Sequence, residues 1–134
     1  MLFRSSPEAF REMEARGELV ESTSYNGHAY GLPWSSLDGG EGVVVVVDPP
    51  GVANLRARFG RRVVVFGLLG LSEEELRLRL VSRGDPSGQV EERLQLARLE
   101  AEAVRSCADE VLPAMALEEL RAEVLARMAK RRTP

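Results

Sequence analysis

The chain has 134 residues, enough for one domain that buries about two-thirds of the surface of its extended chain. Hydrophobic residues make up 44% of it, which excludes wholesale disorder, and a net charge of −3 gives no general attraction to nucleic acid or membranes. The apolar runs at 43–47 and 63–71 are too short to cross a bilayer, and one cysteine cannot form an internal disulfide. Because the amino end also lacks the long apolar core of a signal peptide, we expect a cytoplasmic protein with neither nucleic-acid nor membrane partners.

The first residues predict a helix followed by a hairpin. A serine at position 5 or 6 precedes Pro7, the arrangement of a capped helix start, and Gly17 is expected to end that helix. Residues 18–31 form two short strands around Tyr25-Asn26-Gly27, because Asn-Gly favours a turn with positive φ. A helical turn is expected at 34–37.

The middle of the chain carries the signature of a parallel sheet. Residues 43–47 are five consecutive valines, a pattern typical of a strand buried on both faces. Asp48 follows at the carboxyl end of this strand, which is where ligands bind in open α/β sheets. A short helix at 52–59 then leads to a second buried strand at 63–69.

Helices dominate the remainder. Ser72 and Glu75 have the spacing of a capping box, which predicts a helix that runs to about residue 82. A break rich in Gly, Pro and Asp follows Arg83. After it come the remaining predicted elements, a helix from about 87 or 89 to 108, a short strand at 111–112 and an amphipathic helix at 117–131.

Several segments, in order, resemble the guanylate kinase family. They read PEAFREM, GELVE, YNGHAYGLP and VVVVVDPPG, followed by VVVFGLL, LRLRLVSRG and EERL. Their order and spacing make a chance match improbable, although no single piece is specific. The resemblance implies an α/β fold, a truncated P-loop NMP-kinase-like parallel sheet with helices and a small β-rich NMP-binding insertion. It implies one domain over 1–134, with a partial NMP-binding region at about 1–37, a partial core at 43–134 and a lid near 79–93.

The family also has a strand, a phosphate loop and a helix ahead of its NMP-binding region. No G-x-x-x-x-G-K-[ST] motif occurs in these 134 residues. The corresponding strand normally lies between the two valine-rich strands. We therefore expect that the two strands pair directly, or that another copy or a partner chain fills the gap, and we predict a homo-oligomer or a rearranged sheet.

The resemblance assigns the substrate-binding residues. Glu21 matches the family carboxylate that reads the guanine edge, since a carboxylate accepts two hydrogen bonds side by side, as N1–H and N2–H₂ offer them. Tyr30 matches a tyrosine that contacts the GMP phosphate. Arg79, also assigned to substrate binding, matches one of the arginines that the family brings onto the transferring phosphate through the lid. Without the resemblance, the favoured interpretation of Glu21 is an exposed strand residue.

The resemblance also assigns catalytic residues. Arg83 and Arg93 match arginines that the lid brings onto the transferring phosphate, for which guanidinium forks are suited. Asp48 matches an acid near the nucleotide phosphates and magnesium. Open alternatives are that Asp48 caps the next turn and that the arginines lie on a solvated helix face, paired with Glu73, Glu74, Glu91 and Glu92.

The functional hypothesis is a guanylate-kinase-like protein that retains part of a GMP or phosphate site and by itself transfers no phosphate from ATP. No cofactor is certain, and Mg and ATP are expected only if a phosphate-loop segment is supplied. One alternative is a module that binds phosphorylated peptides. Others are part of an active ATP:GMP phosphotransferase completed by a missing segment or partner, and a remnant or a piece of a longer reading frame.

Overall fold

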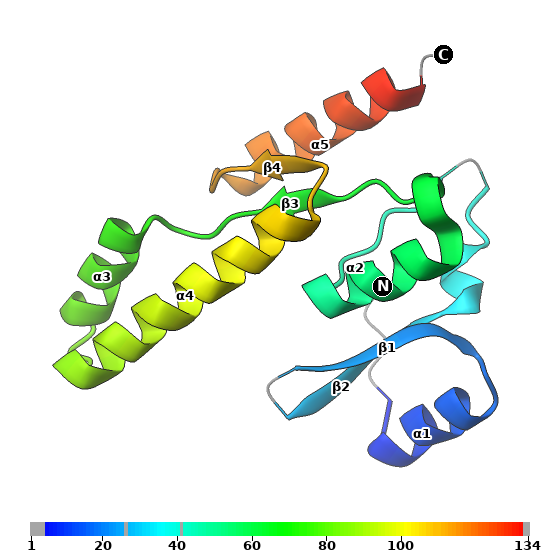
Figure 1. Cartoon of the computed structure of the whole chain (residues 1–134), viewed down its shortest axis with the longest axis horizontal. Coiled ribbons are helices and arrows are strands. Elements are labelled where there is room, and N and C mark those ends of the chain that lie inside the picture. Colours follow the sequence, from blue (N-terminus) through cyan, green and yellow to red (C-terminus); the bar gives the residue numbers. More distant parts are fainter. Residues whose placement is uncertain (1–4, 26, 41, 133–134) are drawn as a thin grey trace. The chain divides into compact units, whose positions relative to one another are not determined.

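The computed structural model describes residues 5–25, 27–40 and 42–132 (Figure 1). The chain divides into two compact units, Met1–Val63 and Val64–Pro134. Helices and two small sheets make up the described residues, so the predicted mixed α/β class is confirmed. Among these residues, no helix is both long and apolar enough to cross a membrane.

The first unit begins with a helix and a hairpin, as predicted. Its elements are α1 (Pro7–Ala15), β1 (Leu19–Tyr25), β2 (His28–Pro33), the 3-10 helix η1 (Trp34–Leu37), α2 (Pro49–Phe59) and the 3-10 helix η2 (Gly60–Arg62). Ser6 caps α1 by accepting the Ala9 N–H at 3.1 Å, and Gly17 follows the helix with φ 68°. The expected turn residue Asn26 lies outside the described residues, and Gly27 beside it has φ 77°.

The hairpin lies between the two helices of this unit (Figure 1). β1 and β2 are antiparallel, with Glu21 opposite Leu32 and Thr23 opposite Tyr30, and the register shifts between Leu19 and Glu21. On the α1 side, a Cβ on Gly31 would lie 3.0 Å from the Phe10 ring. Glu21 faces the other side, toward α2, where a Cβ on Gly51 would lie 3.1 Å from Glu21 Oε2.

The valine segment corrects one prediction. Residues 43–47 are not a strand, and Val44 and Val46 are 65% and 96% exposed. β-branched composition favours extended backbone, but a strand also needs a hydrogen-bonded neighbour. The described residues offer this segment no neighbouring strand, so the prediction of a strand buried on both faces is wrong here.

The second unit combines a parallel strand pair with three helices. Its elements are β3 (Phe66–Leu68), α3 (Glu73–Ser82), α4 (Ser87–Cys107), β4 (Glu110–Leu112) and α5 (Leu117–Arg132). β3 and β4 are parallel, so the predicted parallel pairing is present, although the strand expected at 63–69 shortens to three residues.

Two kinds of contact stabilise the second unit. The α3–α4 hairpin buries Leu80, Val90 and Leu94, with Leu76 packed against them. α3 begins with the predicted capping box, in which the Ser72 hydroxyl accepts the Glu75 N–H at 3.3 Å. Where α5 meets β4, Arg131 Nη2 donates to Glu110 Oε1 at 2.9 Å.

Candidate functional site

Glu21 is a buried carboxylate with an unused acceptor. It lies on β1, just after the register shift, and is 8% exposed. The side chain of Asn54 on α2 lies near that of Glu21, while Glu21 Oε2 is buried with no hydrogen-bond partner among the described residues. Burial raises the pKa of Glu21, and the negative charge of Asp48 raises it further, whereas the Asn54 hydrogen bond lowers it. The alternative of an exposed strand residue is therefore wrong for Glu21.

Asp48 caps α2. Its Oδ1 accepts the Gly51 N–H at 2.9 Å, and its carbonyl accepts the Val52 N–H at 3.0 Å. Pro49 and Pro50 have no N–H, so the first turn of α2 has no free backbone donor with which to hold a phosphate. The capping alternative is thus what the structure shows, and the catalytic assignment of Asp48 stays a prediction.

Glu21 and Asp48 meet across Gly51. A Cβ on Gly51 would lie 3.0 Å from Asp48 Oδ1 and 3.1 Å from Glu21 Oε2. Any larger residue at this position would push on one of the two carboxylates. The structure therefore brings together two of the predicted site residues, Glu21 and Asp48, within the first unit.

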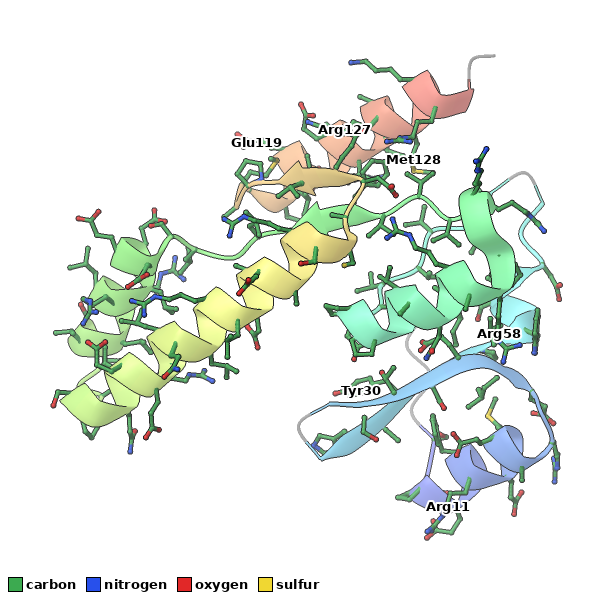
Figure 2. All side chains as sticks on the ribbon, viewed as in Figure 1. Arg11, Tyr30, Arg58, Glu119, Arg127 and Met128 are labelled. Carbon is green, nitrogen blue, oxygen red and sulfur yellow. The ribbon has the colours of Figure 1, made fainter. Side chains whose placement is uncertain are left out.

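A cavity of about 600 Å³ adjoins Glu21. Its lining comes from α1, β1 and α2 and consists of Glu14, Gly17, Leu19, Val20, Glu21, Ser22, Asn54, Ala57 and Arg58. Arg58 lies near the carboxyl end of α2 (Figure 2). Its guanidinium is 5.7 Å from the centre of the Trp34 ring. This cavity therefore offers both negative and positive side chains to a ligand.

Tyr30 lies on the same face of the hairpin as Glu21. The register pairs Tyr30 with Thr23 and Leu32 with Glu21, and side chains two residues apart on a strand point the same way. Tyr30 is 48% exposed on β2 and lies outside the lining of the cavity (Figure 2). Its phenol is therefore available to a ligand on this face.

The three predicted arginines lie in the second unit. Arg83 caps the carboxyl end of α3, and its Nε donates to Asp85 Oδ1 at 2.8 Å. The charge of Arg93, on α4, also acts on Asp85, and the two arginines hold the pKa of that carboxyl below its usual range. The hydrogen bonds from Ser72 hold the pKa of Glu75 below its usual range, and the charge of Arg79, on α3, adds to this effect. The structure thus pairs Arg83 with Asp85 and places Arg93 within electrostatic reach of the same carboxylate.

Two of the four glutamates expected to pair with these arginines bind other arginines. Glu73 accepts from Arg98 Nε at 2.8 Å, and Glu91 accepts from Arg77. Both ion pairs connect α3 to α4. These ion pairs therefore help to hold the two helices of the hairpin together.

The residues present do not complete a metal site. Within 5–25, 27–40 and 42–132, no group of three or more His, Cys, Asp or Glu side chains could hold a metal ion. Asp48 is a single acid whose Oδ1 accepts the Gly51 N–H, so any Mg²⁺ beside it would take most of its oxygen ligands from water and substrate phosphates.

Sequence reasoning missed Asn54 and Asp85. The sequence could have indicated that Asp85 pairs with Arg83, since Asp85 lies two residues after Arg83 and beyond the end of a helix. It gave no such indication for Asn54, because only the packing of α2 against β1 brings its amide to Glu21.

Comparison with solved structures gives the class of fold. The chain matches the crystal structure of guanylate kinase from Anaplasma phagocytophilum with a TM-score of 0.77, over 98% of this chain and 65% of that one. Sequence identity is 23%, so this likeness shows the fold alone.

Sequence relatives give the more particular assignment. The chain is 32% identical over 108 residues to guanylate kinase of Halalkalibacterium halodurans, covering 77% of this chain and 52% of that protein. Against guanylate kinase of Streptomyces coelicolor, identity is 33% over 129 residues, covering 92% of this chain and 64% of that protein. No family model matches. The protein is a guanylate-kinase-like domain, which confirms the resemblance read from its segments, and it spans about half the length of the first of these relatives.

Proposed function

We propose that this domain binds GMP through the guanine edge at Glu21 and that these 134 residues alone do not transfer phosphate from ATP. The observation that carries the first part is Glu21 Oε2, buried without a hydrogen-bond partner among the described residues. Leaving a buried acceptor unpaired costs about 1–3 kcal/mol, and more when it is charged. A ligand N–H placed against Oε2 removes that cost.

The chemistry of the site favours guanine over adenine. Guanine presents N1–H and N2–H₂ side by side, and an ionised carboxylate accepts both. Adenine presents the N1 acceptor at the equivalent edge, so its lone pair would face the negative charge of Glu21. A site built around a polar contact rejects a base that lacks the matching groups.

The phosphate contacts belong to the same proposal. Tyr30 shares a face of the hairpin with Glu21 and carries a phenol that donates to a phosphate oxygen. Arg79, Arg83 and Arg93 remain the proposed arginine set. Because Asp85 already engages Arg83, a phosphate would have to replace this carboxylate or share the guanidinium with it.

A phosphopeptide is the competing ligand. Its phosphate would need arginine and tyrosine, and it would not need the carboxylate of Glu21. The buried acceptor therefore favours GMP, and Glu21 is the residue at which the two ligands diverge.

Isothermal titration of the chain with GMP, with AMP as the control ligand, tests the proposal. We expect selective binding of GMP that weakens at least tenfold in Glu21→Gln, because a hydrogen bond to a charged group contributes about 1.5–3 kcal/mol. Glu18→Gln is the matched control, since Glu18 is an exposed glutamate three residues earlier. Equal binding of GMP and AMP, or no effect of Glu21→Gln, would refute guanine recognition at this site.

A further inference from the structure

The first unit carries a row of arginine and aromatic side chains at the carboxyl end of α2. The Arg58 guanidinium lies 5.7 Å from the centre of the Trp34 ring, and the Trp34 and Phe59 rings meet edge to face with their centres 6.0 Å apart. The Arg62 guanidinium lies 5.8 Å from the centre of the Phe59 ring. The contacts thus run from one cation through two aromatic rings to a second cation.

This row is accessible to a ligand. Trp34 is 42% exposed, and Arg58, Arg61 and Arg62 are exposed as well. Among the described residues, no carboxylate forms an ion pair with any of these three arginines. A guanidinium that stacks on a ring is weakly hydrated and keeps N–H donors at its edge, where an anion can bind them.

Arginines elsewhere in the first unit are paired with acids. Arg11 lies 3.3 Å from Glu8, and Arg16 lies 3.4 Å from Glu12. Residues 49–72, by contrast, contain four arginines and no Asp or Glu. The net charge of −3 is an average over the chain, and this segment departs from it with a local excess of positive charge.

The end of the helix explains only part of the row. Its unpaired carbonyl groups carry a partial negative charge, which attracts cations in the last turn of α2, where Arg58 lies. That attraction requires no aromatic partner. It also gives no reason for an indole that keeps 42% of its surface in contact with solvent.

Single-stranded nucleic acid matches both components of the row. A simple anion or an acidic peptide would use the guanidinium groups and leave the exposed indole without a stacking partner. In single-stranded nucleic acid, the phosphates bind arginines and the bases stack on aromatic rings or on guanidinium planes. Phosphates and bases also alternate along such a strand, as cations and rings occur together in this row.

We infer that Trp34, Arg58, Arg61 and Arg62 form a binding surface for single-stranded nucleic acid, in which a base stacks on Trp34 and phosphates bind the three arginines. The surface lies within the first unit, and the inference does not rest on the proposed GMP site. For this patch it replaces the expectation of no nucleic-acid partner, which rested on the net charge of the whole chain.

Trp34 is the only tryptophan in the chain, so its selectively excited fluorescence reports on this surface. The 134-residue protein is titrated with an oligouridylate of about 12 nucleotides, a length within the site sizes of single-strand-binding folds. Linear polyphosphate of equal charge, a polyglutamate peptide and phosphatidylserine vesicles are the comparison ligands. We expect the oligonucleotide to quench Trp34 and to bind with a dissociation constant of about 1–100 μM.

The salt dependence counts the phosphate contacts. Three contacts on a single strand predict that log K falls with log[salt] with a slope of about −2. Arg61→Gln/Arg62→Gln removes two of these charges and should reduce the slope to about −0.7. Arg11→Gln is the matched control, since Arg11 lies in the same unit and is paired with Glu8, and it should change nothing.

Trp34→Leu separates stacking from charge. It keeps the arginines, so we expect about tenfold weaker binding with an unchanged salt slope, the order expected for the loss of one stacked base. Anisotropy of a labelled oligouridylate measures this variant, and circular dichroism verifies that every variant is folded. If Trp34→Leu does not fold, the arginine variant and the quenching of Trp34 in the wild type still decide the test.

Several results would overturn the inference. They are the absence of quenching at 50 mM salt, an affinity unchanged in Arg61→Gln/Arg62→Gln, and preferential binding of vesicles or polyglutamate. Equal binding of polyphosphate and oligouridylate, with no effect of Trp34→Leu, would show a general anion-binding surface and overturn it as well. Quenching by the oligouridylate, with a smaller salt slope in the arginine variant and none of these changes in Arg11→Gln, supports it.

Discussion

Glu21 lies where binding and stability make opposite demands on a side chain. Burial and the charge of Asp48 raise its pKa from the ordinary value of 4.5. Above the folded-state pKa, Glu21 is ionised in the folded and unfolded chains alike, so the folded state bears the cost of a buried charge. As the pH falls through that pKa toward 4.5, the folded chain takes up a proton first and the cost disappears.

Glu21→Gln should therefore stabilise the protein at neutral pH. The neutral amide keeps the volume of the side chain and removes the repulsion from Asp48, so we expect a gain of about 0.5–2 kcal/mol, typical when a functional residue is replaced. Urea unfolding at pH 7 and pH 4 measures it, and the gain should shrink at pH 4. Glu18→Gln serves as control at both values. If Glu21→Gln instead destabilised the protein at pH 7, the ionised carboxylate of Glu21 would contribute to the stability of the fold.

At the residue scale, the sequence predicted some side chains better than others. The Ser6 cap and the capping box at Ser72 depend on neighbours within a few residues, and local spacing reveals such features. The partners of Glu21 and Arg83 depend on packing. Glu21 and the first residue of α2 are separated by 27 residues, which include the second strand of the hairpin. No local sequence pattern predicts a contact over that separation.

At the element scale, the position of β3 requires its backbone to lie very close to the end of α4. A Cβ on Gly67 would lie 2.6 Å from Val104 Cγ1 and 2.7 Å from Ala108 Cβ, both closer than atoms in contact. Gly67 thus permits the strand to lie directly on the carboxyl end of the helix. Its role is steric, since its φ is not in the positive region.

Gly67→Ala should destabilise the second unit by about 1–3 kcal/mol, because the added methyl group forces the strand and helix apart. Thermal unfolding followed by circular dichroism measures the loss. Gly70→Ala is the matched control: nothing lies within 4 Å of a Cβ at Gly70, and we expect it to be neutral or slightly stabilising. Equal effects of the two variants would contradict the packing explanation.

The valine segment illustrates the limit of composition at this scale. Five β-branched residues favour extended backbone, but whether such a segment becomes a strand depends on a neighbour far away in sequence. Val46, 96% exposed, marks a segment without that neighbour among the described residues. Association with a second copy or another chain stays a prediction.

At the scale of the whole molecule, phosphoryl transfer requires more than a GMP site. It needs donors and a lysine around the ATP β- and γ-phosphates, which supply much of the electrostatic stabilisation. These 134 residues contain no phosphate-loop motif, and the capped start of α2 has no free backbone N–H to substitute for it.

We therefore expect no appreciable turnover when the 134-residue chain is assayed with ATP, Mg²⁺ and GMP in a coupled assay for ADP. A turnover of about 1–100 s⁻¹, ordinary for kinases, would contradict the expectation. The same preparation is titrated with GMP, so that loss of transfer is distinguished from loss of binding. Binding without turnover is the combined result that the proposed function predicts.

The sequence by itself determined the helices, the hairpin, the mixed α/β class and the relationship to guanylate kinases. The elements follow from local residue spacing. The relationship follows from the order of the segments along the chain, which does not depend on how they pack. Tertiary structure alone decided that Glu21 is buried beside Asp48, that Asp85 engages Arg83 and that residues 43–47 form no strand. The physical reason is that burial, pKa and strand pairing depend on groups far apart along the chain, which meet only when the protein folds.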